Sequence, residues 1–185
     1  FDAPLDMRMN QDNKVSAQTI INTYSEDNLK RLFWEYGELR MAPALARTII
    51  EARAEQTIET TFELKKLLNK YLPKVKQNKI LAQIYQAIRI EVNNELEVLK
   101  AFLIDSKEVL NQNGRLSVIS YHSLEDRLVK RFIRNGMFEG EPERDMFGNF
   151  SVPFKKIGKL IVPTAVEIRK NNRARSAKLR IAQKL

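Results

Sequence analysis

The sequence has no cysteine, a single histidine (His122), no Gly-x-Gly string and no long apolar run. The absence of cysteine excludes disulfides and thiolate metal sites and is typical of proteins of the reducing cytoplasm. One histidine among scattered carboxylates gives no metal-ligand spacing, so we expect no metal site. No segment approaches the roughly 18 apolar residues of a membrane span. We therefore expect a cytoplasmic protein without a membrane partner. The first residue is phenylalanine, so we also expect the chain to be part of a longer protein.

Positive charge is concentrated near the C-terminus. The net charge is +9, and residues 151–185 hold ten Lys and Arg and one acid, whereas residues 1–150 hold 22 basic and 22 acidic residues. Because Lys and Arg release condensed counterions when they meet phosphates, a basic segment on a neutral body is typical of a polyanion binder. A solvated basic tail is the alternative. The best phosphate-contact candidates are Arg173, Arg175 and Lys178, although Arg175 could instead be a buried structural arginine.

The first half of the chain has helical character. Residues 1–13 lack periodicity and predict a loop or linker. Caps and apolar spacing then predict helices at about 25–36, 43–54 and 60–72. A further apolar series predicts one long helix, or two joined near 93–94, that reaches about residue 110. Residues 14–95 are therefore expected to form a mostly helical block.

Residues 114–135 are the most informative segment, because a strand is expected to pass into a helix there. Apolar residues at 116, 118, 119 and 121 predict a short buried strand, and those at 128, 129, 132 and 133 recur at helical spacing. The polar cluster YHSLED lies between them, at 121–126. Open α/β sheets place ligand-contacting residues at this kind of junction. However, Ser123 and Asp126 have capping-box spacing, so the cluster could merely start a helix.

The last third of the chain predicts part of an α/β sheet. Residues 158–162 and 177–182 are candidate late strands, and residues 136–158, rich in glycine and proline, predict a loop. Three strands with one or two helices are too little for a parallel sheet, which needs neighbours and helices on both faces. We therefore expect earlier strands upstream of Phe1 or on another chain.

Five separated strings carry a family resemblance. They are PLDMRM at 4–9, YGE at 36–38, YQAIRI at 85–90 followed by VNNEL at 92–96, GR at 114–115 leading to HSLEDR at 122–127, and RARSAKLR at 173–180. With these strings the chain resembles the MraW-type ribosomal RNA small-subunit methyltransferase H family over nearly its whole length. It departs from the family pattern at Ala3, Leu39, Tyr121 and Asn172 and at the pair 81–82, mostly with residues of similar size.

The resemblance implies an α/β fold, namely the second half of a Rossmann-like methyltransferase sheet with an inserted all-helical domain. It assigns 1–13 to a linker or active-site loop, 14–95 to the helical substrate-recognition insertion, and 96–185 to the C-terminal part of the methyltransferase domain. It implies transfer of a methyl group from S-adenosylmethionine to N4 of a cytidine in the decoding region of 16S rRNA. The partners would be 16S rRNA or the small ribosomal subunit, and self-association stays open. The cofactor-binding residues are expected upstream of Phe1, so this chain alone should be inactive.

The chemistry of such a reaction suggests roles for the polar residues. A methyltransferase acting on an exocyclic amine needs an acceptor for its N–H and a wall for the flipped base. The candidate catalytic residues are His122, Glu125 and Asp126, and Tyr121 could form the wall. The substrate-binding candidates are Asp6, Arg8, Tyr121, Ser123, Arg173, Arg175 and Lys178. Asp6 and Arg8 could instead pair with each other in a loop that packs on the sheet.

Two other functions compete with this interpretation. The helical block and basic tail could form a non-catalytic RNA-binding module. A hydrolase built on His122 and Ser123 is the catalytic alternative, but adjacent residues of one turn cannot easily face each other as base and nucleophile.

Overall fold

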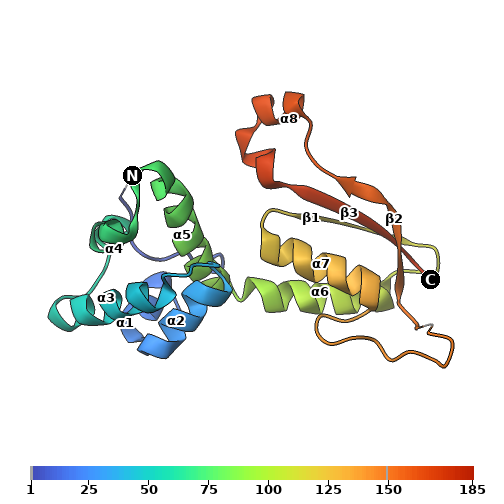
Figure 1. Cartoon of the computed structure of the whole chain (residues 1–185), viewed down its shortest axis with the longest axis horizontal. Coiled ribbons are helices and arrows are strands. Elements are labelled where there is room, and N and C mark those ends of the chain that lie inside the picture. Colours follow the sequence, from blue (N-terminus) through green and yellow to red (C-terminus); the bar gives the residue numbers. More distant parts are fainter. Residues whose placement is uncertain (1, 149) are drawn as a thin grey trace. The chain divides into compact units, whose positions relative to one another are not determined.

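The computed structural model describes residues 2–148 and 150–185 (Figure 1). The chain divides into two compact units, Phe1–Glu95 and Leu96–Leu185. No helix among these described residues is long and apolar enough to cross a bilayer.

The first unit is helical. Its elements are α1 (Ala17–Thr23), α2 (Glu26–Glu35), α3 (Ala42–Glu55), α4 (Thr61–Leu68), the 3-10 turns η1 (Asn69–Tyr71) and η2 (Lys74–Lys76), and α5 (Gln77–Asn93). The expected helices at 25–36, 43–54 and 60–72 are confirmed as α2, α3 and α4 with η1. Helix α1 is missing from the sequence-based prediction. Its capping box joins Ser16 to Thr19, a residue less usual at that position than Glu or Gln.

The segment expected to be a linker packs against the helices of the first unit. Leu5 is 1% exposed, and its N–H donates to Glu59 O at 2.9 Å. Pro4 and Thr60 form an isolated bridge beside it. Leu5 therefore belongs to the core that also holds Ile20, Phe33 and other buried side chains of the helices.

Of the two alternatives for the later helical stretch, the structure has two helices. Helix α5 ends at Asn93, its C-cap Asn94 has a φ of 50° in the left-handed region, and α6 (Glu95–Val109) follows. Asparagine tolerates this conformation better than most residues, so the break matches the chemistry of the residue at it.

The second unit places helices on a three-stranded sheet. It contains most of α6, then β1 (Arg115–Ser120), α7 (Ser123–Asn135), β2 (Phe154–Ile161), α8 (Ala165–Lys170), the 3-10 turn η3 (Asn172–Ser176) and β3 (Lys178–Lys184). The strand order is β1-β3-β2, and β3 is antiparallel to both neighbours. The expectation of parallel pairing is wrong for these strands. Strands β1 and β2, between which α7 lies in the sequence, are parallel to each other. The C-terminal strand β3 lies between them in the sheet and is antiparallel to both.

One face of the sheet forms the core of the second unit. Leu116 and Val118 of β1, Ala182 of β3 and Phe154 of β2 pack there against α7, and Figure 1 shows α6 and α7 along this side of the strands. Burial along β1 alternates, as it does in a strand with one covered face. The expectation that the whole strand is buried is therefore wrong, because Ile119 is 57% exposed on the other face.

Candidate functional site

The junction of β1 and α7 is closed by a capping box. His122 is the N-cap, and its Nδ1 accepts the backbone N–H of Glu125 at 3.4 Å. The Glu125 carboxylate forms the other half of the box, because its Oε2 accepts the backbone N–H of Tyr121 at 2.7 Å and that of His122 at 3.3 Å. The predicted capping pair, Ser123 and Asp126, is therefore wrong by one residue. Ser123 is instead the first residue of α7.

The histidine and the glutamate of this turn also face each other through their side chains. His122 Nε2 lies 3.4 Å from Glu125 Oε1, and the two side chains are 7% and 24% exposed. The Nδ1 lone pair is already engaged, because it accepts the backbone N–H of Glu125. The Nδ1 atom is thus not available to take a proton from Ser123, which argues against the hydrolase alternative.

Asp126, in the first turn of α7, joins that helix to the central strand. Arg180 donates from Nε to Oδ1 at 2.7 Å and from Nη2 to Oδ2 at 3.1 Å, and Lys178 Nζ lies 3.2 Å from Oδ2. Burial alone would raise the pKa of Asp126, but the hydrogen bonds and charges of Arg180 and Lys178 outweigh it and hold the pKa below its ordinary value. The carboxylate therefore acts as an anchor whose acceptor positions are largely occupied.

Arg180 is the residue of this cluster that sequence reasoning missed. The strand's alternation offered a signal for it. Lys178 and Arg180 are four and two residues from the buried Ala182, so all three side chains lie on the same, covered face of β3. A charge on the covered face of a strand requires a partner of opposite charge nearby. The sequence did not reveal which acid that partner is.

Tyr121 and the basic segment are open to solvent. Tyr121 follows β1 directly and is 57% exposed, so its ring is available to a ligand. Arg173 and Arg175 lie exposed on η3, which Asn171 caps through Arg173 N at 3.1 Å. Arg175 is thus not a buried structural arginine.

Asp6 and Arg8 lie in the first unit and pair with each other. Arg8 donates from Nε and Nη2 to the two oxygens of Asp6 at 2.7 and 2.9 Å, and from Nη1 to Gln11 O and Asn13 O. The hydrogen bond from Arg8 lowers the pKa of Asp6 to about 2. All donor groups of the guanidinium have partners within the loop, so Arg8 shapes the loop.

The same loop is held in a strained conformation. Met7, between the paired residues, has a φ of 61°, which is uncommon for a side chain of this size. Asn93 at the end of α5 fixes it, because its Nδ2 donates to Met7 O at 2.8 Å and its Oδ1 accepts Met9 N–H at 2.7 Å. A strained backbone held by a dedicated side chain is typical of a functional loop.

Comparison with known proteins gives one consistent result. A model of the MraW methylase family matches residues 1–185. Ribosomal RNA small subunit methyltransferase H of Flavobacterium johnsoniae is 68% identical over 185 residues, which are 100% of this chain and 61% of the relative. The proteins of the same name from Christiangramia forsetii and Cytophaga hutchinsonii are 65% and 51% identical, and the chain covers 61% and 62% of them. The chain thus spans about three fifths of the length of these curated relatives.

Proposed function

The chain belongs to the MraW methylase family, and we propose that the protein uses S-adenosylmethionine to methylate N4 of a cytidine in the decoding region of 16S rRNA. The proposal is carried by 68% identity over all 185 residues to a protein named ribosomal RNA small subunit methyltransferase H. The substrate is then 16S rRNA or the small ribosomal subunit, and the reaction takes place in the cytoplasm. The helical unit serves substrate recognition, and the second unit supplies the last strands of the methyltransferase sheet.

The residues of this chain do not by themselves fit S-adenosylmethionine. A nucleotide-like cofactor is usually held by a glycine-rich turn after a strand and by an acid that binds the ribose. The sequence has no Gly-x-Gly string, and β1 runs directly into the capping box of α7. We place the main cofactor contacts upstream of Phe1. Titration calorimetry on the isolated chain should accordingly give no heat of S-adenosylmethionine binding, whereas micromolar binding would contradict this placement.

Glu125 is the best acceptor for a proton of the target amine. The exocyclic amine of cytosine must lose one proton and keep its lone pair aligned while it is methylated. We assign the ring proton of His122 to Nε2, because Nδ1 accepts a backbone N–H, and His122 is then not the acceptor. Each carboxylate oxygen has two lone pairs, so Glu125 can accept a further N–H beside the two that it receives from the backbone. His122 is then a positioning residue that fixes this carboxylate.

Tyr121 and Asp126 complete the proposed site. The exposed ring of Tyr121 can stack on the target base after the base leaves its neighbours. Asp126 is a positioning residue, because its bonds to Arg180 and Lys178 fix the start of α7 on β3. Replacement of Tyr121 by Ala should weaken RNA binding and slow methylation, whereas Tyr121→Phe should retain both.

The rival is a non-catalytic RNA-binding module, which the exposed Arg173 and Arg175 favour. Only the methyltransferase forms N4-methylcytidine, so this product distinguishes the two functions. The full-length protein is incubated with methyl-labelled S-adenosylmethionine and with small ribosomal subunits that lack the modification. The RNA is then digested to nucleosides for mass spectrometry. Label in N4-methylcytidine supports the methyltransferase, and RNA binding without label supports the module.

A further inference from the structure

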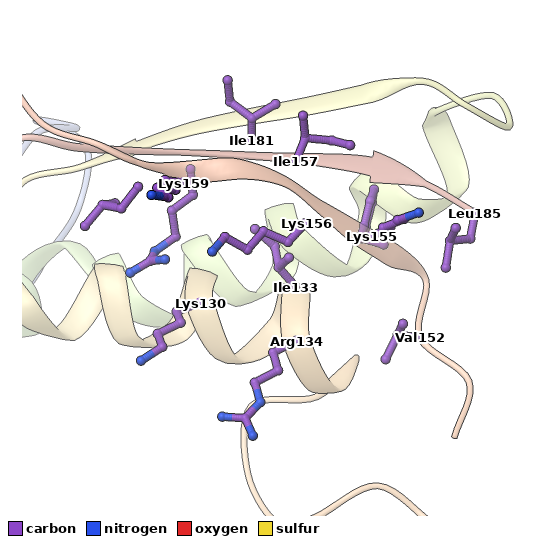
Figure 2. A pocket seen from close by; sticks show the side chains of 13 residues that line it. Lys130, Ile133, Arg134, Val152, Lys155, Lys156, Ile157, Lys159, Ile181 and Leu185 are labelled. Carbon is purple, nitrogen blue, oxygen red and sulfur yellow. The ribbon is translucent and has the colours of Figure 1, made fainter. Parts of the chain in front are cut away.

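A basic groove lies on the second unit, between α7 and the edge strand β2 (Figure 2). Its volume is about 400 Å³, and Lys130, Arg134, Lys155, Lys156, Lys159 and Arg180 contribute its cations. None of its described lining residues has an acidic side chain. Val152, Ile157 and Leu160, which are at least partly exposed, give it an apolar surface. The groove thus combines positive charge with apolar contact area.

Five of the six cations have no ion-pair partner among the residues that the structure describes. Arg180 pairs with Asp126. The other five are exposed, and across residues 2–148 and 150–185 none of the five forms an ion pair. Unpaired cations gathered around one groove repel each other, and an anionic ligand would relieve that repulsion.

Edge protection explains only one wall of the groove. Lysines on an edge strand prevent pairing with another chain, which would account for Lys155, Lys156 and Lys159 on β2. It does not account for Lys130 and Arg134, which lie on α7 at the other side of the groove (Figure 2). Strand β2 is also irregular here, because its register with β3 shifts between Ile157 and Ile161.

We propose that this groove binds a single-stranded segment of RNA, with phosphates on the five free cations and a base against the apolar surface near Leu160. Single-stranded nucleic acid is bound in this way, by a positive groove that follows the backbone and by side chains that contact the bases. The volume is that of a site for a small ligand or a nucleotide. The proposal rests on the proposed function and extends it, because it names where the substrate is held away from the reacting base.

The groove is set at a definite distance from the capped turn. Lys130 and Arg134 follow His122 by eight and twelve residues along α7, or about 12 to 18 Å at 1.5 Å per residue. That distance corresponds to roughly four or five stacked nucleotides. The groove therefore holds RNA that flanks the target cytidine.

The test measures RNA binding apart from methyl transfer. Fluorescence anisotropy with a labelled single-stranded oligoribonucleotide of the decoding region gives the affinity of the full-length protein between about 50 and 200 mM salt. The groove variant is Lys155→Ala, Lys156→Ala and Lys159→Ala together. The control replaces Lys100 and Lys107 of α6 by Ala, because these lysines lie outside the groove and already pair with Glu97 and Glu108. A variant with Arg at the three β2 positions keeps the charge.

The groove variant should bind at least about tenfold more weakly at low salt. Its log-log salt slope should fall by about 2, since each lost phosphate contact on a single strand removes about 0.7. The Arg variant and the control should keep the slope. Leu160→Ala should weaken binding at an unchanged slope, because it removes a base contact and no phosphate contact. Unfolding curves that match the wild type show that each variant is folded.

An unchanged affinity and slope in the groove variant, or an equal loss in the control, would overturn the proposal. Self-association of the groove variant with normal RNA binding would also overturn it and leave the lysines as edge protection. These outcomes are separate from the proposed function, which fails if the wild type binds RNA but produces no N4-methylcytidine.

Discussion

The ion pair between Asp126 and Arg180 should be a principal stabilising contact of the second unit. Removing one partner of a buried pair typically costs 3–5 kcal/mol, because the other charge stays buried without compensation. The two side chains are 12% and 13% exposed, and Lys178 also points at the carboxylate. Because Asn keeps one acceptor oxygen, we expect Asp126→Asn to lower the free energy of unfolding by about 3 kcal/mol. At about 2–4 °C per kcal/mol for a domain of 150–250 residues, Tm should fall by about 6–12 °C.

The pH dependence gives this prediction a second readout. The pKa of Asp126 is lowered in the folded protein, so the pair contributes fully above the ordinary pKa of an unfolded aspartate, about 3.9. The contribution is lost as pH falls through the lower pKa of the folded state. Thermal unfolding followed by circular dichroism should therefore show a large Tm difference between wild type and Asp126→Asn at pH 7. The difference should shrink progressively below about pH 4.

Two variants serve as controls. Asp105→Asn removes an exposed carboxylate of α6 and should change stability by less than about 0.5 kcal/mol. The double variant Asp126→Asn with Arg180→Met should recover part of the loss, because no uncompensated guanidinium then stays buried. A wild-type Tm for Asp126→Asn at pH 7, or a Tm difference that does not change down to pH 3, would refute the anchor role.

Three further predictions concern the turns and loops. Glu125→Ala removes one half of the capping box and should lower the free energy of unfolding by about 1 kcal/mol, measured by thermal unfolding. Ser123→Ala lies outside the box and should lower it less. The reverse order would contradict the assigned cap. Asn94→Val should lower the free energy of unfolding in urea by about 1–2 kcal/mol, because valine fits the left-handed conformation poorly, and Asn94→Gly should leave it nearly unchanged. Equal effects of the two variants would contradict a strained cap. Asp6→Asn should speed hydrogen exchange in residues 6–13 at neutral pH, and because the pKa of Asp6 is about 2, wild type should approach the variant only near that pH. Equal exchange in both proteins at neutral pH would contradict the loop assignment.

Local structure followed from the sequence where neighbours in the chain decide it. Ser25 caps α2 through Asn28 N, and Thr60 with Glu63 forms the capping box of α4, as their spacing predicted. The break near 93–94 also follows from local chemistry, because Asn94 is one of the few residue types that accept a positive φ. These features depend on contacts over three or four residues.

Features decided by distant residues could not be predicted in this way. Asp126 and Arg180 are 54 residues apart, so no local pattern pairs them. The insertion of β3 between β1 and β2 likewise depends on long-range pairing. The capping register moved by one residue because an imidazole nitrogen can serve as the capping acceptor, a role usually expected of Ser, Thr, Asp or Asn.

The capped turn at His122 and Glu125 is the centre of the proposed function, and the rate of methyl transfer by full-length variants tests it most directly. His122→Ala and Glu125→Gln should each lower the rate of N4-methylcytidine formation at least about tenfold, equal to about 1.4 kcal/mol of transition-state stabilisation. RNA affinity should stay within about twofold of wild type, because phosphate contacts lie elsewhere. The measurement is single-turnover methylation of small-subunit RNA at saturating S-adenosylmethionine, with Tm recorded for each protein. Wild-type rates in both variants, or losses of rate that follow the losses of Tm, would contradict the account and leave the turn as only the start of a helix.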